Sequence, residues 1–194
     1  AGGAPRFGDD RAKAKGGGMA RTVGADAHAR NNWFVVTRMG RSAGHRAFGI
    51  GTAAHCPMII IPEMFNRTTI TVDRIVRLVI SSIIKRKLMG LDYGVAMISE
   101  GVFHELSTEE LTAAGVTFSY DEHGHPELWK VSKSHVLCTL IDAEMARLKL
   151  KIRPRPVELG YEMRCQTPIA YAPASAATRT YGVVSFCAER RTRA

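Results

Sequence analysis

A histidine that directly follows a run of small residues is the first feature of this sequence that could do chemistry. The block Gly51-Thr52-Ala53-Ala54-His55-Cys56 comes just after the apolar segment 47–50. A strand that ends in small residues would place the His55 imidazole at the lip of a barrel, with room for a substrate. An imidazole in that position can serve as a general base, which requires a nucleophile and an orienting carboxylate elsewhere in the chain.

The hexapeptide around His55 resembles the Thr-Ala-Ala-His-Cys block around the general base of trypsin-like proteases. In that family the orienting carboxylate follows several strands later and opens another strand. The segment 91–98 fits, because Asp92 stands at its start, and it resembles the family's Asp-x-Ala-Leu type of block. Asp73 is a rival acid, but it follows His55 more closely and leads into a segment that starts with charge. The resemblance therefore implies that Asp92 orients His55.

The nucleophile is implied by a second resemblance, since the sequence contains no Gly-Asp-Ser-Gly-Gly. Residues 163–169, Met-Arg-Cys-Gln-Thr-Pro-Ile, resemble the Gly-x-Cys-Gly-x-Pro block of chymotrypsin-like cysteine proteases from picorna-like RNA viruses. This resemblance implies that Cys165 is the nucleophile, and that the backbone N–H groups of Met163 and Cys165 form the oxyanion hole. A free thiol has a pKa of about 8.5, so the His55 imidazole would have to activate it.

The same resemblance implies a substrate pocket. Residues 181–186 resemble the strand that flanks the primary specificity pocket of these proteases. The expected substrate-binding residues are Gly160, Tyr161, Val183, Val184 and Ser185. None of them is a histidine, which accepts the substrate glutamine in many such enzymes, so we expect a small or apolar residue before the cut.

Short β-branched segments separated by turn residues predict an all-β fold. Together with the resemblance they predict a chymotrypsin-like double β-barrel with short helices, one at 62–65 and one from Ser107 to Gly115. The predicted strands are 33–37, 47–52, 58–61, 69–72, 75–84, 93–98, 116–120, 135–141, 146–152, 168–171 and 181–186.

The predicted barrels divide the chain into four segments. Residues 1–30 are rich in Gly, Ala, Arg and Lys, which predicts a flexible or partly helical N-terminal arm. Residues 31–102 would form an N-terminal β-barrel that carries His55 and Asp92. Residues 103–125 would connect the domains, and residues 126–194 would form a C-terminal β-barrel that carries Cys165.

Composition narrows the choice of compartment and partner. The 194 residues carry a formal net charge of +9, which indicates solubility or an anionic partner. Two basic clusters could contact RNA, although an exposed charged face is the commoner explanation for such clusters: Lys85-Arg86-Lys87 and the alternating set Arg147, Lys149, Lys151 and Arg153. The apolar runs are too short to span a bilayer, and no stretch is typical of a signal peptide.

The four cysteines include no Cys-x-x-Cys pair, so no metal site is expected, and no cofactor is expected either. In secreted relatives of trypsin, the cysteine after the catalytic histidine pairs with one on the preceding strand. No cysteine precedes Cys56 here, so that bridge cannot form, which favours a reducing compartment.

The function that follows is a cysteine endopeptidase that processes a viral polyprotein through a thioester acyl-enzyme, in the cytoplasm of the infected host cell. Two alternatives stay open. One is a serine-type protease that uses Ser175 or Ser185. The other is a catalytically degenerate protease fold that binds RNA or forms a structural shell.

Overall fold

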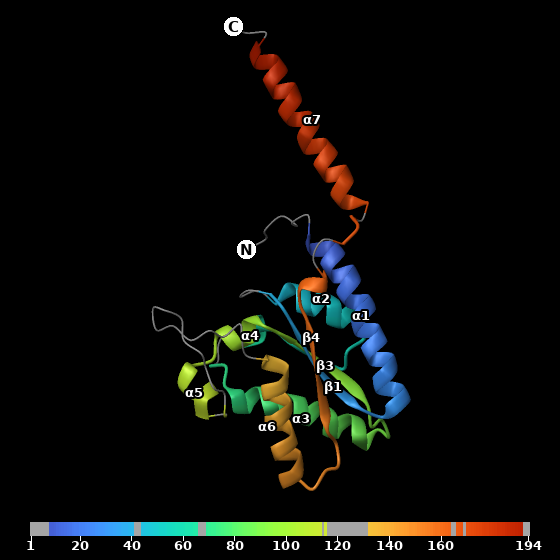
Figure 1. Ribbon diagram of the computed structural model, residues 1–194, viewed down its shortest axis with the longest axis vertical. Helices are drawn as coiled ribbons and strands as arrows, with labels where there is room; N and C mark the ends of the chain where they lie inside the picture. Colours follow the sequence, from blue (N-terminus) through green and yellow to red (C-terminus); the bar gives the residue numbers. More distant parts are fainter. Residues whose placement is uncertain are drawn as a thin grey trace.

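Four parallel strands form the centre of the molecule (Figure 1). The computed structural model describes residues 8–40, 44–65, 69–113, 115, 132–163, 166–168 and 170–191. The strands are β1 (Trp33–Arg38), β2 (Met58–Ile60), β3 (Gly94–Ser99) and β4 (Pro154–Leu159), in the order β2-β3-β1-β4. Every neighbouring pair is parallel. The central strands β1 and β3 are buried along their whole length, as is usual for parallel sheets covered on both faces.

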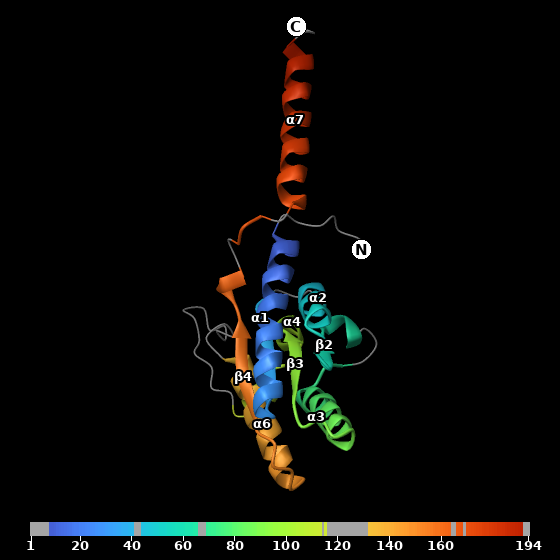
Figure 2. The same cartoon turned by 90° about the vertical axis from the view of Figure 1, so that its right-hand side faces the viewer.

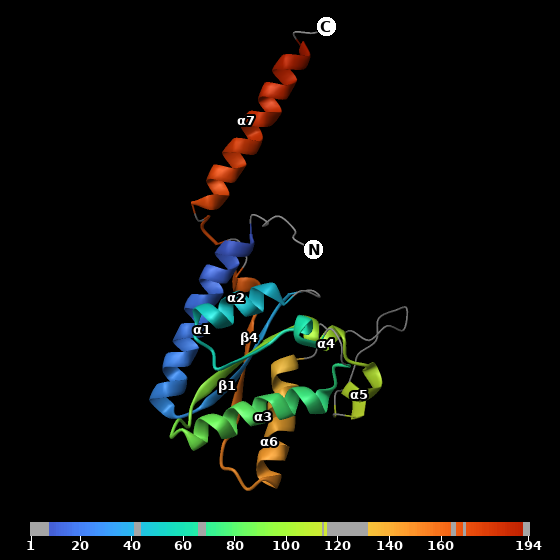
Figure 3. The same cartoon turned by 180° about the vertical axis from the view of Figure 1, so that it is seen from behind.

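Helices cover both faces of this sheet. One face carries α1 (Asp9–Arg30), α2 (His45–Ala53) and the short helix η3 (Tyr161–Met163). The other carries α3 (Val72–Leu88), α4 (Gly101–His104), α5 (Thr108–Ala113), α6 (Lys133–Arg147) and the short helix η1 (Pro62–Phe65). The last helix, α7 (Tyr171–Arg191), extends away from the sheet and its covering helices (Figures 2 and 3). Side chains of β1 alternate between the two cores, which makes the sheet the shared wall of both.

The predicted all-β double barrel is therefore wrong. Helix α3 shows the reason, because its β-branched residues were interpreted as a strand although their spacing is helical. The buried positions on this helix are Val72, Ile75, Val76, Val79, Ile80 and Ile83, which recur every three to four residues and form one apolar stripe.

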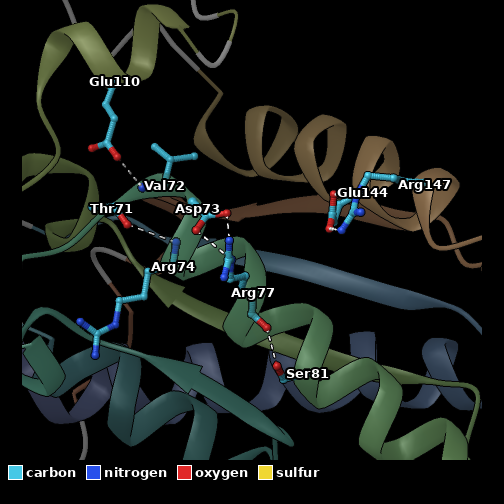
Figure 4. Close-up of polar contacts among 9 residues, drawn as sticks. All are labelled: Thr71, Val72, Asp73, Arg74, Arg77, Ser81, Glu110, Glu144 and Arg147. Atoms are coloured by element: carbon cyan, nitrogen blue, oxygen red, sulfur yellow. Dashed lines mark hydrogen bonds and ion pairs between the residues drawn. The ribbon is translucent and has the colours of Figure 1, made fainter.

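The start of α3 is fixed by side chains that the strand interpretation did not use (Figure 4). The Thr71 hydroxyl accepts a hydrogen bond from the Arg74 backbone N–H at 3.2 Å, as an N-cap residue does. The Glu110 carboxylate on α5 accepts another from the Val72 N–H at 3.3 Å. Both groups satisfy N–H donors that the first turn of a helix leaves unpaired.

Some individual elements were predicted correctly. Three predicted strands coincide with β1, β2 and β3, and both short helices are confirmed as η1 and α5. The Ser107 hydroxyl caps α5 by accepting from the Glu110 N–H at 3.2 Å. Five predicted strands are helical instead, or end a helix: 47–52 in α2, 75–84 in α3, 135–141 in α6, 146–152 at the end of α6, and 181–186 in α7. Residues 69–72 lead into α3, the described residues of 168–171 contain no strand, and 116–120 lie outside the described residues.

The segments predicted as two separate β-barrels share one sheet instead. Strands β1 and β4 were assigned to different barrels, at 31–102 and 126–194, yet they pair directly from Trp33 with Pro154 to Arg38 with Leu159. The boundaries at 31–102, 103–125 and 126–194 stay a prediction in themselves. Residues 9–30 of the predicted arm form α1, which packs against α2 and the sheet.

Candidate functional site

The connections between strands single out one switch point in this sheet. The chain moves from β1 to β2 across the face of α2. It moves from β2 to β3, and from β3 to β4, across the face of α3 and α6. The neighbouring strands β1 and β3 therefore send their outgoing connections to opposite faces. In open parallel sheets, ligands bind outside the carboxyl ends of the strands at such a switch point.

Glu100 lies at this switch point, directly after the carboxyl end of β3. Its Oε2 accepts a hydrogen bond of 2.7 Å from the backbone N–H of Gly40, at the end of β1. Its Oε1 lies 2.9 Å from the Nζ of Lys133, at the start of α6. Burial works to raise the pKa of Glu100, but the Gly40 N–H and the Lys133 ammonium outweigh it and hold that pKa below its ordinary value. Glu100 is thus an ionised acceptor at neutral pH, and its oxygens retain lone pairs for a further donor.

A buried charge cluster lies beside Glu100 on the α1 and α2 side. Asp9, in the first turn of α1, accepts a hydrogen bond from the Nε of Arg46, and its other oxygen lies 3.5 Å from the Nε2 of His45. Burial works to raise the pKa of Asp9, but Arg46 and then His45 lower it overall. Arg38 ends β1 in this cluster. Burial, and then repulsion from Arg46, lower the Arg38 pKa to about 10.

The third group at this edge of the sheet belongs to β4 and α6. Glu158 Oε1 accepts hydrogen bonds from the hydroxyls of Ser132, at 2.8 Å, and Ser134, at 3.1 Å. A carboxylate at a helix N-terminus is favourable because of the helix dipole. Glu158 therefore fixes the start of α6, and with it the position of Lys133. Among the described residues, no group of three or more His, Cys, Asp or Glu side chains is arranged to hold a metal ion.

The residues predicted as a triad are not brought together in the described part of the chain. His55 is exposed and follows the C-terminus of α2, with a left-handed backbone (φ 54°). Asp92 is exposed at the amino-terminal edge of the sheet, where its carboxylate pairs with Lys87 Nζ at 2.8 Å. There it lines an open depression of about 1140 Å³. Cys165 lies outside the described residues.

Of the predicted oxyanion hole only Met163 lies within the described residues, and the predicted substrate-pocket residues fall in two separate parts of the described chain. Met163 is buried in η3, where its Sδ lies against α1 at Gly16. Gly160 and Tyr161 follow the carboxyl end of β4. The remaining three, Val183, Val184 and Ser185, lie on α7.

The residues that do meet at the switch point were not predicted as site residues from the sequence. Glu100 and Arg38 each end an apolar run, and a charged residue directly after a buried strand is a usable signal. This signal indicates a shared site only when the sheet is known to be parallel. The carboxyl ends of parallel strands meet at one edge, whereas those of antiparallel strands do not. Lys133 carried no such signal.

Comparisons with known proteins agree with this architecture. A comparison with protein-family models found no match. The pyrophosphate–fructose 6-phosphate 1-phosphotransferase of Thermotoga maritima is 36% identical over 183 residues, which cover 94% of this chain and 43% of that protein. This chain is similar to pyrophosphate-dependent phosphofructokinases. The corresponding enzyme of Naegleria fowleri is 37% identical over 177 residues, covering 87% of this chain and 40% of that protein.

The fold comparison leads to the same group. The crystal structure of Pichia pastoris phosphofructokinase in the T-state matches with a TM-score of 0.63 at 18% identity, covering 94% of this chain and 17% of that one. The fold is therefore of the phosphofructokinase type. The chain spans about two fifths of the length of the curated relatives it matches.

These findings overturn the protease interpretation. The resemblance to viral cysteine proteases, the endopeptidase function and the viral polyprotein as partner are wrong, because the sequence similarity to phosphotransferases covers nearly the whole chain. With them, the role of His55, Asp92 and Cys165 as a triad loses its support, and so do the serine-type and degenerate-protease alternatives.

RNA as a partner is corrected as well, because the similarity is to phosphotransferases, and three of the basic residues meant to contact RNA bind other groups of the protein. Lys87 pairs with Asp92, Arg147 pairs with Glu144, and Arg86 donates to the carbonyl of Tyr93 at 2.9 Å. Among the described residues, none of the helices combines the length and the apolar character needed to cross a bilayer.

Proposed function

We propose that this chain is part of a cytoplasmic phosphotransferase that uses pyrophosphate to phosphorylate fructose 6-phosphate at its 1-hydroxyl. The observation that carries the proposal is Glu100. It is a partly buried, ionised carboxylate at the switch point of a phosphofructokinase-type sheet, held by Gly40 and Lys133. The sequence similarity to two such phosphotransferases supplies the reaction and its substrates.

The chemistry of the site suits that reaction. In phosphoryl transfer the protein mainly positions the two substrates and stabilises charge on the transferred group. Glu100 can accept a hydrogen bond from a sugar hydroxyl, and this contact would orient the sugar at the carboxyl edge of the sheet. The cations Lys133, Arg38 and Arg46 surround the same edge and favour an anionic substrate.

The test compares Glu100→Gln with the unmodified protein. The amide is isosteric but neutral, so it weakens the hydrogen bond to a sugar hydroxyl and loses the ion pair with Lys133. Loss of a charge-assisted hydrogen bond costs about 1.5–3 kcal/mol, so we expect kcat/KM for fructose 6-phosphate to fall roughly 10- to 150-fold. Glu144→Gln, on an exposed turn of α6, is the control and should leave kcat/KM unchanged.

Because the chain spans only part of its relatives, fructose 6-phosphate binding is measured by calorimetry alongside turnover. Absence of both binding and pyrophosphate-dependent turnover in the unmodified protein would reject the proposal. Equal loss in the two variants would reject the role of Glu100.

A further inference from the structure

Arg38 is a buried cation whose N–H donors find no acceptor among the described residues. Only 4% of this residue is exposed, yet within the described residues its guanidinium makes no hydrogen bond, and its Nε is fully buried. An arginine carries five N–H donors and no acceptor. Buried charges in proteins are almost always paired and hydrogen-bonded, because an unsatisfied one costs several kcal/mol.

Two carboxylates lie close enough to attract Arg38, but both hold other donors, and Arg38 donates a hydrogen bond to neither of them. Asp9 uses one oxygen for Arg46 and the other for His45. Glu100 uses one for the Gly40 N–H and the other for Lys133. Both carboxylates attract Arg38 through space, but neither bonds to it.

The guanidinium lies against Gly40, two residues after the end of β1. Its Nη1 lies so close to Gly40 that a β-carbon on that residue would collide with it. Arg46, in the first turn of α2, is near enough to repel Arg38. The N-terminus of α2 adds partial positive charge. Its N-cap residue is Gly44, which has no side chain to cap the helix. Glu63 accepts from the Gly44 N–H at 2.8 Å, and the N–H groups of the next residues have no partner within the helix.

We propose that a phosphate-like oxyanion binds between Arg38, Arg46 and the first turn of α2. Such an anion supplies the acceptors that the Arg38 donors lack, and it relieves the repulsion between the two guanidinium groups. A planar guanidinium can bind a phosphate through two parallel hydrogen bonds, which a lysine cannot do. That the oxyanion is a phosphate group of a substrate rests on the proposed function, whereas the site itself does not.

The experiment titrates the 194-residue chain with inorganic phosphate, followed by calorimetry and by the phosphorus NMR line width. Arg38→Met keeps an unbranched apolar stem and removes the charge and the N–H donors. We expect its dissociation constant for phosphate to rise at least tenfold, while the control Arg77→Met, an exposed partner of Asp73, retains the wild-type value. Equal phosphate binding by the protein and by Arg38→Met would overturn the proposal.

A second readout keeps the test sharp if Arg38→Met alters folding. Without phosphate, we expect Arg38→Met to melt no lower than the unmodified protein, because it loses an unsatisfied buried charge. It should lack the upward shift of the melting temperature that phosphate gives the unmodified protein. Gly40→Ala keeps every charge but presses on the guanidinium, and it should also weaken phosphate binding. A large fall in melting temperature for Arg38→Met, with no phosphate-dependent shift in the unmodified protein, would mean a purely structural arginine.

Pyrophosphate and fructose 6-phosphate are titrated as separate arms to identify the source of the oxyanion. Competition of either with inorganic phosphate, lost in Arg38→Met, assigns the site to that substrate. Phosphate binding without competition or turnover would uphold the site and reject the proposed function. Turnover with unchanged KM values in Arg38→Met, together with unchanged phosphate binding, would uphold the function and reject the site.

Discussion

Glu100 illustrates how neighbours rather than burial decide the charge of a residue. Its carboxylate is partly withdrawn from water, which alone would favour the neutral acid. The Gly40 N–H and the Lys133 ammonium reverse that preference, and each comes from a different element of the fold. An ionised carboxylate accepts a stronger hydrogen bond from a hydroxyl group than a neutral oxygen does. The chemistry of this one residue therefore depends on β1, β3 and α6 together.

This dependence predicts how Lys133→Met responds to pH. The pKa of Glu100 in the folded protein lies below its ordinary value of 4.5, so its ionised form stabilises the fold above that value. The contribution is lost as the pH falls from about 4.5 through the lower, folded pKa. Without Lys133, burial moves the folded pKa upward, and we expect roughly 1–3 kcal/mol less stability at pH 7 and an acid-unfolding midpoint at higher pH.

Urea unfolding at pH 7 and at pH 3 measures this difference, with Lys85→Met on the exposed side of α3 as control. The gap between Lys133→Met and the unmodified protein should shrink at pH 3, because Glu100 protonates in the unfolded chain below its ordinary pKa of 4.5 and the stabilisation is then progressively lost. A gap that stays constant with pH would show that Lys133 acts through packing rather than through its charge.

Helix α1 shows how one local pattern can support two opposite structures. The run Gly16-Gly17-Gly18 lies in the segment predicted as a flexible or partly helical arm, and glycine has the lowest helix propensity after proline. In the structure, Gly16 and Gly17 face α2, and a β-carbon on Gly16 would meet Ile50 Cγ1 at 2.9 Å. Gly18 has nothing within 4 Å. Gly16 and Gly17 thus serve close packing of α1 against α2, whereas Gly18 does not.

Alanine at the two ends of this run should have opposite effects. Gly18→Ala adds helix propensity without a collision, so we expect a gain of about 0.5–1 kcal/mol. Gly16→Ala gains the same propensity but displaces the fully buried Ile50, so we expect a net loss of about 1 kcal/mol. Chemical denaturation of both variants measures the difference. If both are stabilised equally, α1 does not pack on α2 as closely as the structure shows.

The amount of fold that the sequence could yield differs from element to element. Strands β1, β2 and β3 were found because buried parallel strands are short continuous apolar runs. Helices α3 and α6 were misassigned because composition was weighed above spacing, which is helical in α3. The contact between Glu100 and Gly40 could not be predicted, because they are 60 residues apart and meet only when β1 and β3 pair. A short protease-like motif around His55 then outweighed the periodicity of the longer segments.

At the scale of the whole molecule, the two cores on either side of the sheet contrast with α7. Each core joins strands and helices from distant parts of the chain, whereas α7 extends beyond them (Figure 2). Tyr181 on this helix is 77% exposed and Val184 is 61% exposed. Isolated helices of about 20 residues are marginally stable in water, since most helix stability comes from tertiary packing. The cooperative unit of unfolding should therefore be the sheet with its covering helices.

Removal of residues 171–194 tests this division. We expect the urea-unfolding free energy of the shortened chain to stay within about 0.5 kcal/mol of the full chain, because no core residue is lost. Val184→Ala should be equally silent, whereas Val79→Ala, a fully buried change on α3, should cost about 2 kcal/mol through lost burial and a cavity. Limited proteolysis should cut within α7 before it cuts the sheet, since local unfolding exposes the least packed segments first. A loss of more than about 1 kcal/mol on truncation would mean that α7 packs against the sheet domain in solution, and that the apolar side chains at 181 and 184 are covered there.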